Sequence, residues 1–443
     1  MSHAAPPPVP TGAPAAGAPW PTPQAGDPVW LQVGQLFDGG SGATLRDAHL
    51  VFDATRIRYL GTADRPPPAE LIRAGQRRPD RQLPDHSALP GLTDAHAHLF
   101  LEGGELDLEK RAAYLKQDAA TLLRLAEARL EPLVRLGVIG VRDAGDRNGV
   151  GLALSRQAER TTDRPLMPHL DSPGAAIHHQ GRYGSFMGEP LEQHASPRAC
   201  VEARVAAGAD RIKLIPTGII NFKQGLVTAP PQMTTDEIVE LVAAAHALGR
   251  QTFAHASGDA GIDRVIDGGV DSVEHGFFIR DDQLARLRDH QLAWVPTFAP
   301  VQLQVDCADR MGWDDTVVAH LRRILEAHAA SLVKAHALGV QIVAGSDAGS
   351  VGVAHGFGLL RELELMEAAG LSAAAVLHAA TGAGSDRFAY KERFGRLAAG
   401  YRSRFLLLER SPLETVSHLR GPGWVVFDGN VYEKDAGVTP NGM

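Results

Sequence analysis

The sequence predicts an α/β fold in which a TIM (β/α)8 barrel lies beside a small composite β-sandwich domain. Two observations predict the barrel. Short apolar segments rich in β-branched residues alternate with longer segments of helical period, and this alternation repeats eight times over roughly 300 residues. A third observation predicts the sandwich, because short strand-like segments separated by Gly, Asp and Ser flank the repeats on both sides.

The two ends of the chain differ from its middle. Residues 1–27 are rich in proline and alanine and lack the basic start and continuous apolar stretch of a secretory signal, so we expect a disordered arm. Residues 28–88 carry "VWLQVGQLFDG" and "HLVFDATRIRYLG", and residues 394–443 carry "RFLLLE" and "GWVVFDGNVYE". We expect strands from both ends to pair in the composite β-sandwich domain, with the barrel over residues 89–393.

Eight barrel strands are expected, each a short apolar segment followed by a turn and a helix. They are Leu92–Leu99, Ile139–Gly145, Leu166–Ser172, Arg211–Thr217, Gln251–Ser257, Ser272–Phe278, Ala293–Phe298 and Gln341–Ser346. Helices are expected between them, including residues 118–137, 196–209 and 234–249. The last of these begins with a Thr234/Glu237 capping-box pattern and ends at Gly249.

Composition limits the classes of partner. A net charge of -8, from 44 basic and 52 acidic residues, without a Lys/Arg-rich stripe, argues against nucleic acid. Cys200 and Cys307 are too few for a disulfide framework or a thiolate zinc site. No run of about 18 apolar residues predicts a membrane span. We therefore expect a cytoplasmic protein that acts on a small molecule.

Unusual polar residues fall at the predicted strand ends, where catalytic groups of a barrel collect. His96 and His98 lie two apart in the first strand, so both imidazoles point to one face and could share a metal. Alone, this pair is a weak signal, because two histidines are often merely satisfied or exposed.

Four more residues join the pair from other strands: Lys213, His255, His275 and Asp347 lie late in the fourth, fifth, sixth and eighth predicted strands. Four imidazoles, a carboxylate and an amine suit a zinc-like divalent ion without any thiolate. The spacing therefore predicts a metal site at the mouth of the barrel.

Two of these residues admit alternatives. A lysine on an apolar strand shifts toward the neutral amine, which can add carbon dioxide to give a carbamate that bridges two metals. Lys213 could equally stay cationic and pair with Asp347 or with an anionic substrate. Asp347 is the best candidate for proton transfer, although an aspartate there could also cap the next helix.

Four segments, "LPGLTDAHAHL", "DRIKLIPTG", "FAHASGDAGIDRVIDGGVDSVEHG" and "AGSDAG", resemble the amidohydrolase superfamily, and most closely its imidazolonepropionase-like and prolidase-like hydrolases. The resemblance implies a barrel beside a β sandwich and a binuclear site for two Zn²⁺, with Mn²⁺ or Co²⁺ as alternatives. The implied roles are His96 and His98 on one metal, His255 and His275 on the other, carboxylated Lys213 bridging, and Asp347 as metal ligand and acid/base.

Softer matches extend the candidate site. Arg142 and Asp143, in "VRDAG", could contact substrate or could form an internal ion pair. In "SPGAAIHHQGRYG", where relatives carry a substrate loop, His178, His179 and Tyr183 are candidate substrate contacts. Loop histidines are often only solvated, so the choice between His178 and His179 stays open.

Two segments depart from the family pattern. "TGIINFKQG" replaces a common Ser/Thr-Gly-Gly and places Ile219, Ile220 and Phe222 at the substrate mouth, which argues against a small polar dipeptide. Ser403 and Arg404 replace a usual Ala-Asp, a change that we assign to the β domain.

The leading hypothesis is metal-dependent hydrolysis of an amide-type bond in a dipeptide, N-acyl amino acid, carbamate or urea. A mononuclear hydrolase or deaminase of a cyclic substrate is the alternative, although such deaminases place a glutamate just after the fifth-strand histidine, and here Ala-Ser-Gly follows His255. Lactones and esters remain open, and a non-catalytic scaffold is disfavoured by the six retained ligand-type residues. Relatives often associate, so a homo-oligomer is also open.

Overall fold

The computed structural model describes residue 20 and residues 27–40, 44–160 and 166–436. The predicted arm over residues 1–27 lies outside them except for Trp20 and Asp27. The Trp20 ring packs edge-on against Trp424, with 5.2 Å between ring centroids, and Arg81 lies over it at 5.1 Å. Among the described helices, none combines the length and apolar character that crossing a bilayer requires.

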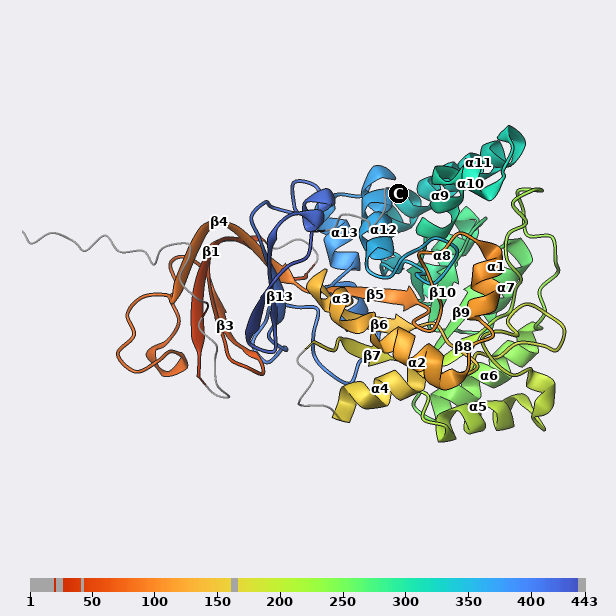
Figure 1. The fold of residues 1–443 in the computed structure, drawn as a ribbon, viewed down its shortest axis with the longest axis horizontal. Coiled ribbons are helices and arrows are strands. Elements are labelled where there is room, and N and C mark those ends of the chain that lie inside the picture. Colours follow the sequence, from red (N-terminus) through yellow and green to blue (C-terminus); the bar gives the residue numbers. More distant parts are fainter. Residues whose placement is uncertain (1–19, 21–26, 41–43, 161–165, 437–443) are drawn as a thin grey trace, which may run out of the picture.

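A seven-stranded sheet joins the two ends of the chain and lies at one end of the molecule (Figure 1). Its strands, in spatial order, are β15 (Asn430–Glu433), β14 (Gly423–Phe427), β13 (Arg404–Leu408), β4 (Arg81–Pro90), β1 (Val29–Phe37), β2 (Thr44–Phe52) and β3 (Ile57–Gly61). β13 runs antiparallel to β4, with Phe405 opposite Pro90. Strands from both ends therefore share one sheet, while the two-layer sandwich and the domain bounds stay predictions.

Eight further strands are parallel and lie in chain order in two sheets. The first sheet holds β5 (Leu92–Ala97), β6 (Val138–Asp143) and β7 (His169–Asp171). The second holds β8 (Ile212–Leu214), β9 (Thr252–Ala256), β10 (Ser272–His275), β11 (Ala293–Val295) and β12 (Gln341–Ile342). Every strand overlaps a segment that the sequence predicts, and each is shorter than expected.

Backbone hydrogen bonds link the two parallel sheets at both edges. On one side, Ile177 donates to the carbonyl of Lys213 at 2.9 Å and forms a parallel bridge with Leu214. On the other side, Ala95 donates to Ala344 at 3.0 Å. The strands are described as two sheets rather than one closed ring, so the complete barrel stays a prediction that these links support.

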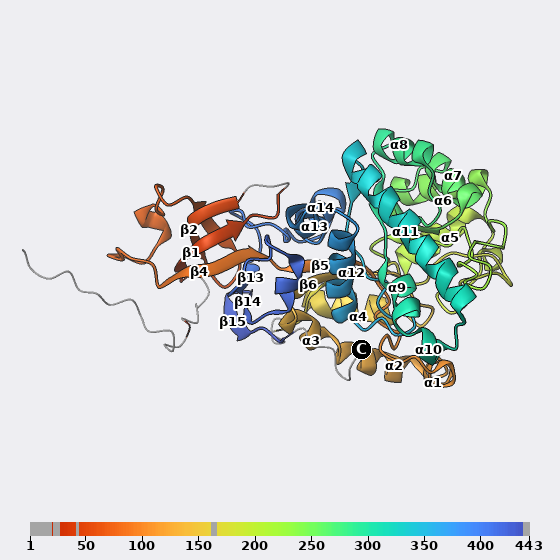
Figure 2. The ribbon, with the colours of Figure 1, turned by 90° about the horizontal axis from the view of Figure 1, so that it is seen from above.

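Helices surround the parallel strands, as the two perpendicular views show (Figure 1 and Figure 2). They are α1 (Leu108–Tyr114), α2 (Ala119–Glu127), α3 (Leu130–Arg135), α4 (Val150–Arg160), α5 (Pro197–Ala206), α6 (Thr235–Ala247), α7 (Asp259–Asp267), α8 (Asp281–Asp289), α9 (Ala299–Asp306), α10 (Ala308–Met311), α11 (Asp315–Leu338), α12 (Phe357–Ala368), α13 (Ala373–Ala379) and α14 (Gly382–Arg387). Short 3-10 helices cover Ala69–Leu71, Leu191–Gln193 and Val416–Arg420.

Local chemistry explains where these helices start and stop. The Thr234 hydroxyl accepts from the Glu237 backbone while the Glu237 carboxylate accepts from that of Thr234, so the predicted capping box is present. The helix predicted over residues 118–137 is instead two helices. Pro132 lies four residues after Ala128, where α2 ends, and a proline ring clashes with the carbonyl of the residue four positions earlier.

Candidate active site

A cavity of about 320 Å³ opens at the carboxyl ends of the parallel strands. The six predicted ligand residues all line it, and so does Tyr183; the lining residues are His96, His98, Leu101, Arg111, Leu115, Tyr183, Phe186, Met187, Lys213, Ile219, Ile220, Phe222, His255, Ser257, His275, Phe277, Thr297, Pro300, Val301, Gln304, Asp347, Ser350 and Val351. Segments distant in sequence therefore bring the candidate groups together.

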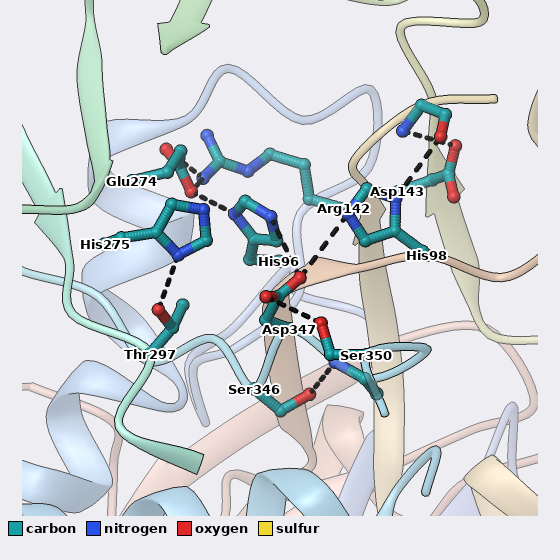
Figure 3. Close-up of polar contacts among 12 residues, drawn as sticks. His96, His98, Arg142, Asp143, Glu274, His275, Thr297, Ser346, Asp347 and Ser350 are labelled. Carbon is teal, nitrogen blue, oxygen red and sulfur yellow. Dashed lines mark hydrogen bonds and ion pairs between the residues drawn. The ribbon is translucent and has the colours of Figure 1, made fainter. Parts of the chain in front are cut away.

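Ligand atoms of His96, His98 and Asp347 converge in this cavity (Figure 3). One ligand atom from each residue lies within 4.8 Å of the others, and Asp347 Oδ1 is 3.5 Å from His96 Nε2 and 3.4 Å from His98 Nε2. Backbone pairing fixes this approach: Asp347 donates to the carbonyl of His96, and His98 donates to that of Ala348, each at 2.7 Å. The segment after β12 is thereby held beside the end of β5.

The hydrogen bonds at Nδ1 orient His96 and His98. The His96 Nδ1–H donates to the Glu274 carboxylate at 2.6 Å, and the His98 Nδ1–H donates to the carbonyl of Gly145 at 3.3 Å. Burial, followed by the charge of Lys213, lowers the pKa of His96 to about 4. The neutral His96 ring thus keeps a free electron pair on Nε2, a buried atom without a hydrogen-bond partner among the described residues.

His255 and His275 lie next to this group. The His275 ring centroid is 4.9 Å from that of His96 and 4.5 Å from that of His255. His275 Nδ1 is hydrogen-bonded to the Thr297 hydroxyl at 2.7 Å, whereas the His255 Nε2–H donates to the carbonyl of Gly218 at 3.3 Å. Burial lowers the pKa of His255 to about 3 and that of His275 well below its usual value. Both rings are therefore neutral, and each has a nitrogen electron pair that could bind a metal.

Lys213 is a buried amine without a partner. Its side chain is 1% exposed, and Nζ has no hydrogen bond with any described residue. Nζ lies 4.7 Å from the centre of the Phe253 ring. Burial lowers the pKa of Lys213, the charge of Glu274 opposes this and that of Arg142 adds to it, and the resulting pKa is about 8. An unpaired buried ammonium is costly, so this environment favours the neutral amine.

Asp347 adopts a strained backbone conformation. Its φ is 53°, and φ is 69° at His275 and 52° at Thr297, values that side-chain-bearing residues rarely adopt. Asp94 supports this loop, because its carboxylate accepts from the Ser346 backbone at 2.9 Å and from the Ser346 hydroxyl. Burial would raise the pKa of Asp347, but the neighbouring imidazoles of His98 and His96 hold it well below its usual range.

Glu274 is a site residue that the sequence reasoning missed. Besides His96, its carboxylate accepts from Arg142 Nη2 at 2.8 Å and from the Ser272 hydroxyl at 2.6 Å, and it is fully buried. Burial would raise the pKa of Glu274, yet Arg142 and His96 bring it down to about 2. The sequence does carry a signal for Glu274: in "SVEHG" a carboxylate lies within an apolar strand, and a buried carboxylate needs a hydrogen-bond or ion-pair partner.

Most of the candidate substrate residues lie outside the cavity. Arg142 is 1% exposed, does not line the cavity and pairs with Glu274. Of its two predicted roles, substrate contact or internal ion pair, the structure shows the ion pair. Asp143 accepts from the backbone of Leu99 at 3.1 Å. Both ring nitrogens of His178 contact backbone carbonyls, and His179 pairs with Glu192 at 2.7 Å. Of the loop candidates, only Tyr183 lines the cavity, 5.4 Å from His255 between ring centroids.

Parallel strands that present such groups at their carboxyl ends around a cavity are typical of α/β enzymes. The chain belongs to the amidohydrolase family, whose model, described as "Amidohydrolase family", matches residues 87–431. The protein is therefore a hydrolase of that family, as the four quoted segments indicated.

Individual relatives are distant. An uncharacterised protein of Mycobacterium tuberculosis is 27% identical over 296 residues, 66% of this chain and 72% of that protein. The ochratoxinase of Aspergillus niger is 24% identical over 434 residues, 91% and 86% of the two chains. An imidazolonepropionase of Cupriavidus metallidurans is 29% identical over 180 residues, 34% and 39%.

Among solved structures, a Xaa-Pro dipeptidase with bound methionine superposes with a TM-score of 0.76 at 24% identity, over 92% of this chain and all of that one. This likeness shows the shared fold. Together with the imidazolonepropionase match, it confirms the resemblance to the imidazolonepropionase-like and prolidase-like members.

The donor set fits a divalent metal. Neutral imidazoles and a carboxylate are the ligands that zinc-type ions take when thiolates are absent. Two buried polar atoms at the centre of the cavity, His96 Nε2 and Lys213 Nζ, have no hydrogen-bond partner among the described residues. A bound cation would satisfy the His96 electron pair, which no nearby protein group does.

Proposed function

We propose that the protein hydrolyses an amide-type carbon–nitrogen bond at a site for two divalent metals, Zn²⁺ or alternatively Mn²⁺ or Co²⁺. The observation that carries the proposal is the convergence of ligand atoms from His96, His98 and Asp347 within 4.8 Å. His255, His275 and the unpartnered Lys213 line the same cavity. The proposal includes a closed eight-stranded barrel whose mouth this cavity forms.

The residues divide into two ligand groups. His96 and His98 would hold one ion, His255 and His275 the other, and Asp347 would contact the first. When bound, such ions polarise a carbonyl and lower the pKa of a water molecule. Lys213, as a neutral amine, would add carbon dioxide: its nitrogen would bond to the carbon, one proton would leave, and the resulting carbamate would supply two oxygen ligands.

Asp347 would transfer the proton. Its carboxylate is anionic, half enclosed by His96 and His98, and held in place by backbone bonds on both sides. It accepts a proton from the attacking water and delivers it to the departing nitrogen. Glu274 and Thr297 keep His96 and His275 in the orientations that this geometry needs.

Metal content and hydrolysis test the proposal together. Purified protein supplemented with zinc and bicarbonate should bind about two equivalents of metal, and Lys213→Met about one. Lys434→Met is the matched control, because Lys434 is also buried, at 6% exposed, but contacts the carbonyls of Gly421 and Asp435 away from the cavity. It should keep both equivalents.

Activity is measured on N-acyl amino acids, dipeptides, carbamates and phenylureas. Asp347→Asn should lose at least a hundredfold in kcat while the protein stays folded. One equivalent of metal in the unmodified protein would favour the mononuclear alternative, and hydrolysis of lactones alone would favour an esterase. Protein that binds no metal after supplementation would refute both enzyme readings.

A further inference from the structure

Two separate apolar clusters line the cavity of the candidate metal site and form two walls of it. One wall consists of Tyr183, Phe186 and Met187, from the loop after β7, and packs on Ile215. The rings of Tyr183 and Phe186 meet edge-on with 5.7 Å between centroids. The wall therefore offers two aromatic surfaces beside His255.

The second wall comes from other elements. Ile220 and Phe222 follow β8, Phe277 follows β10, and Val301 lies in α9; all four belong to one hydrophobic cluster and line the cavity. Ile219 extends the wall to the rim, where its side chain is 56% exposed. Such exposure of a large aliphatic residue at a cavity mouth favours contact with an apolar group.

Charged groups are few in this cavity. Among the described residues that line it, Asp347 is the one carboxylate, and the fixed cation is Arg111 of α1. The Arg111 guanidinium donates to the carbonyls of Glu102 and, at 2.7 Å, Gly349, two residues from Asp347. These two bonds use two of its five N–H groups and hold the guanidinium at the cavity wall.

We propose that the substrate is an amide between a bulky, uncharged, apolar or aromatic acyl group and a residue that carries a free carboxylate, with Arg111 as the residue that binds this carboxylate. This inference rests on the proposed function and specifies its substrate. The acyl group lies between the two apolar walls. Hydrolysis breaks the carbon–nitrogen bond, water oxygen bonds to the carbonyl carbon, and the nitrogen gains a proton.

The same charge pattern disfavours a free dipeptide. The α-ammonium group of a dipeptide would enter an apolar cleft whose one carboxylate, Asp347, is already engaged by His96 and His98. A buried ammonium without an anionic partner is costly. An acylated nitrogen removes this charge and adds the apolar surface that the walls bind.

The test compares three compounds: N-(2-naphthoyl)-L-alanine, its carboxamide and L-alanyl-L-alanine. Binding to metal-free protein is measured by calorimetry, and hydrolysis is measured on the metal-loaded protein. We expect the naphthoyl acid to bind at least tenfold more tightly than either other compound, since a charged hydrogen bond and an apolar contact each contribute about that factor.

Variants assign the carboxylate contact. Arg111→Gln should weaken binding of the acid, and raise its KM, about tenfold, while changing the values for the carboxamide less than about twofold. Arg111→Lys should recover part of the loss. Lys110→Gln, next in the chain but exposed and paired with Glu105, is the matched control and should change neither compound.

A second pair tests the walls. Phe222→Ala should reduce the preference for the naphthoyl acid over N-acetyl-L-alanine, whereas Leu226→Ala, in the same loop but 47% exposed and outside the cavity, should leave it unchanged. Equal or tighter binding of the dipeptide, or an equal effect of Arg111→Gln on acid and carboxamide, overturns the inference even if amides are hydrolysed. The expected binding pattern without hydrolysis supports the inference and refutes the proposed function instead.

Discussion

Replacing Glu274 by glutamine tests how the buried polar network holds His96, a candidate metal ligand. The carboxylate accepts from three donors: His96 Nδ1 at 2.6 Å, Arg142 Nη2 at 2.8 Å and the Ser272 hydroxyl at 2.6 Å. A glutamine side chain keeps the shape but removes the charge, and it replaces one accepting oxygen with a donating NH₂ group.

The expected loss follows from burial. Arg142 and Glu274 are 1% and 0% exposed, so Glu274→Gln leaves a guanidinium in the interior without an anion. Breaking a buried pair in this way costs roughly 3–5 kcal/mol of unfolding free energy. Because the His96 ring also loses its carboxylate acceptor, metal affinity should fall about 10- to 100-fold.

Urea unfolding of metal-free protein measures the first effect, and competition with a chelator dye measures the second. Glu364→Gln is the control: Glu364 pairs with Arg420 in a partly exposed ion pair, with side chains 21% and 27% exposed, so the same chemical change should cost about 1 kcal/mol or less and leave metal affinity unchanged. The double variant Arg142→Gln/Glu274→Gln should recover part of the loss. A loss below about 1 kcal/mol with unaltered metal affinity in Glu274→Gln would refute the reasoning.

Two further predictions concern the backbone near Asp347 and a buried carboxyl group. Gly349→Ala should lower kcat at least about tenfold in a folded protein, because φ is +101° there and a Cβ would lie 2.7 Å from the His98 carbonyl oxygen. The control is Gly75→Ala, where φ is +75° and the space is open; it should cost about 1 kcal/mol of unfolding free energy and leave kcat unchanged. Equal effects of the two variants on kcat would contradict this prediction. Burial raises the pKa of Glu362, whose carboxyl group accepts from two backbone N–H groups at the start of α9, to about 8 from 4.5. Between pH 4.5 and 8 the folded protein holds a proton on Glu362 that the unfolded chain has lost. The contribution of this group to the free energy of unfolding is therefore full below pH 4.5 and falls by about 1.4 kcal/mol per pH unit until pH 8. The free energy of unfolding in urea, measured between pH 5 and 8 on metal-free protein, should show that decline in the unmodified protein and lack it in Glu362→Gln. If the two proteins gave parallel pH curves, Glu362 would not be the cause.

The positions of the ligand residues could be predicted because they follow a local rule. A period of two places His96 and His98 on one face, and parallel strands end at a common mouth, so Lys213, His255 and Asp347 had to lie near them. The break between α2 and α3 was also within reach, since Pro132 marks it.

The partners of these residues could not be predicted, because they come from distant strands. Glu274 meets Arg142 only when β10 and β6 face each other inside the fold, and no spacing in the sequence encodes that distance. His178 and His179 show the same limit: the pattern "HH" does not say that backbone carbonyls enclose one ring while a glutamate pairs with the other. Arg111 lies on α1, a short helix without a buried residue, so no sequence pattern distinguished it from other surface arginines.

The strand β4 continues through Gly91 directly into β5, which carries His96, and its partner β13 is among the last elements in the chain. During synthesis on the ribosome, β4 must therefore wait for almost the whole polypeptide before it is covered on that side. Contacts between such distant segments form slowly. The first ligand strand thus reaches its final support late, and a chain that stalls or is cut before β13 would expose the edge of β4 to pairing with other chains.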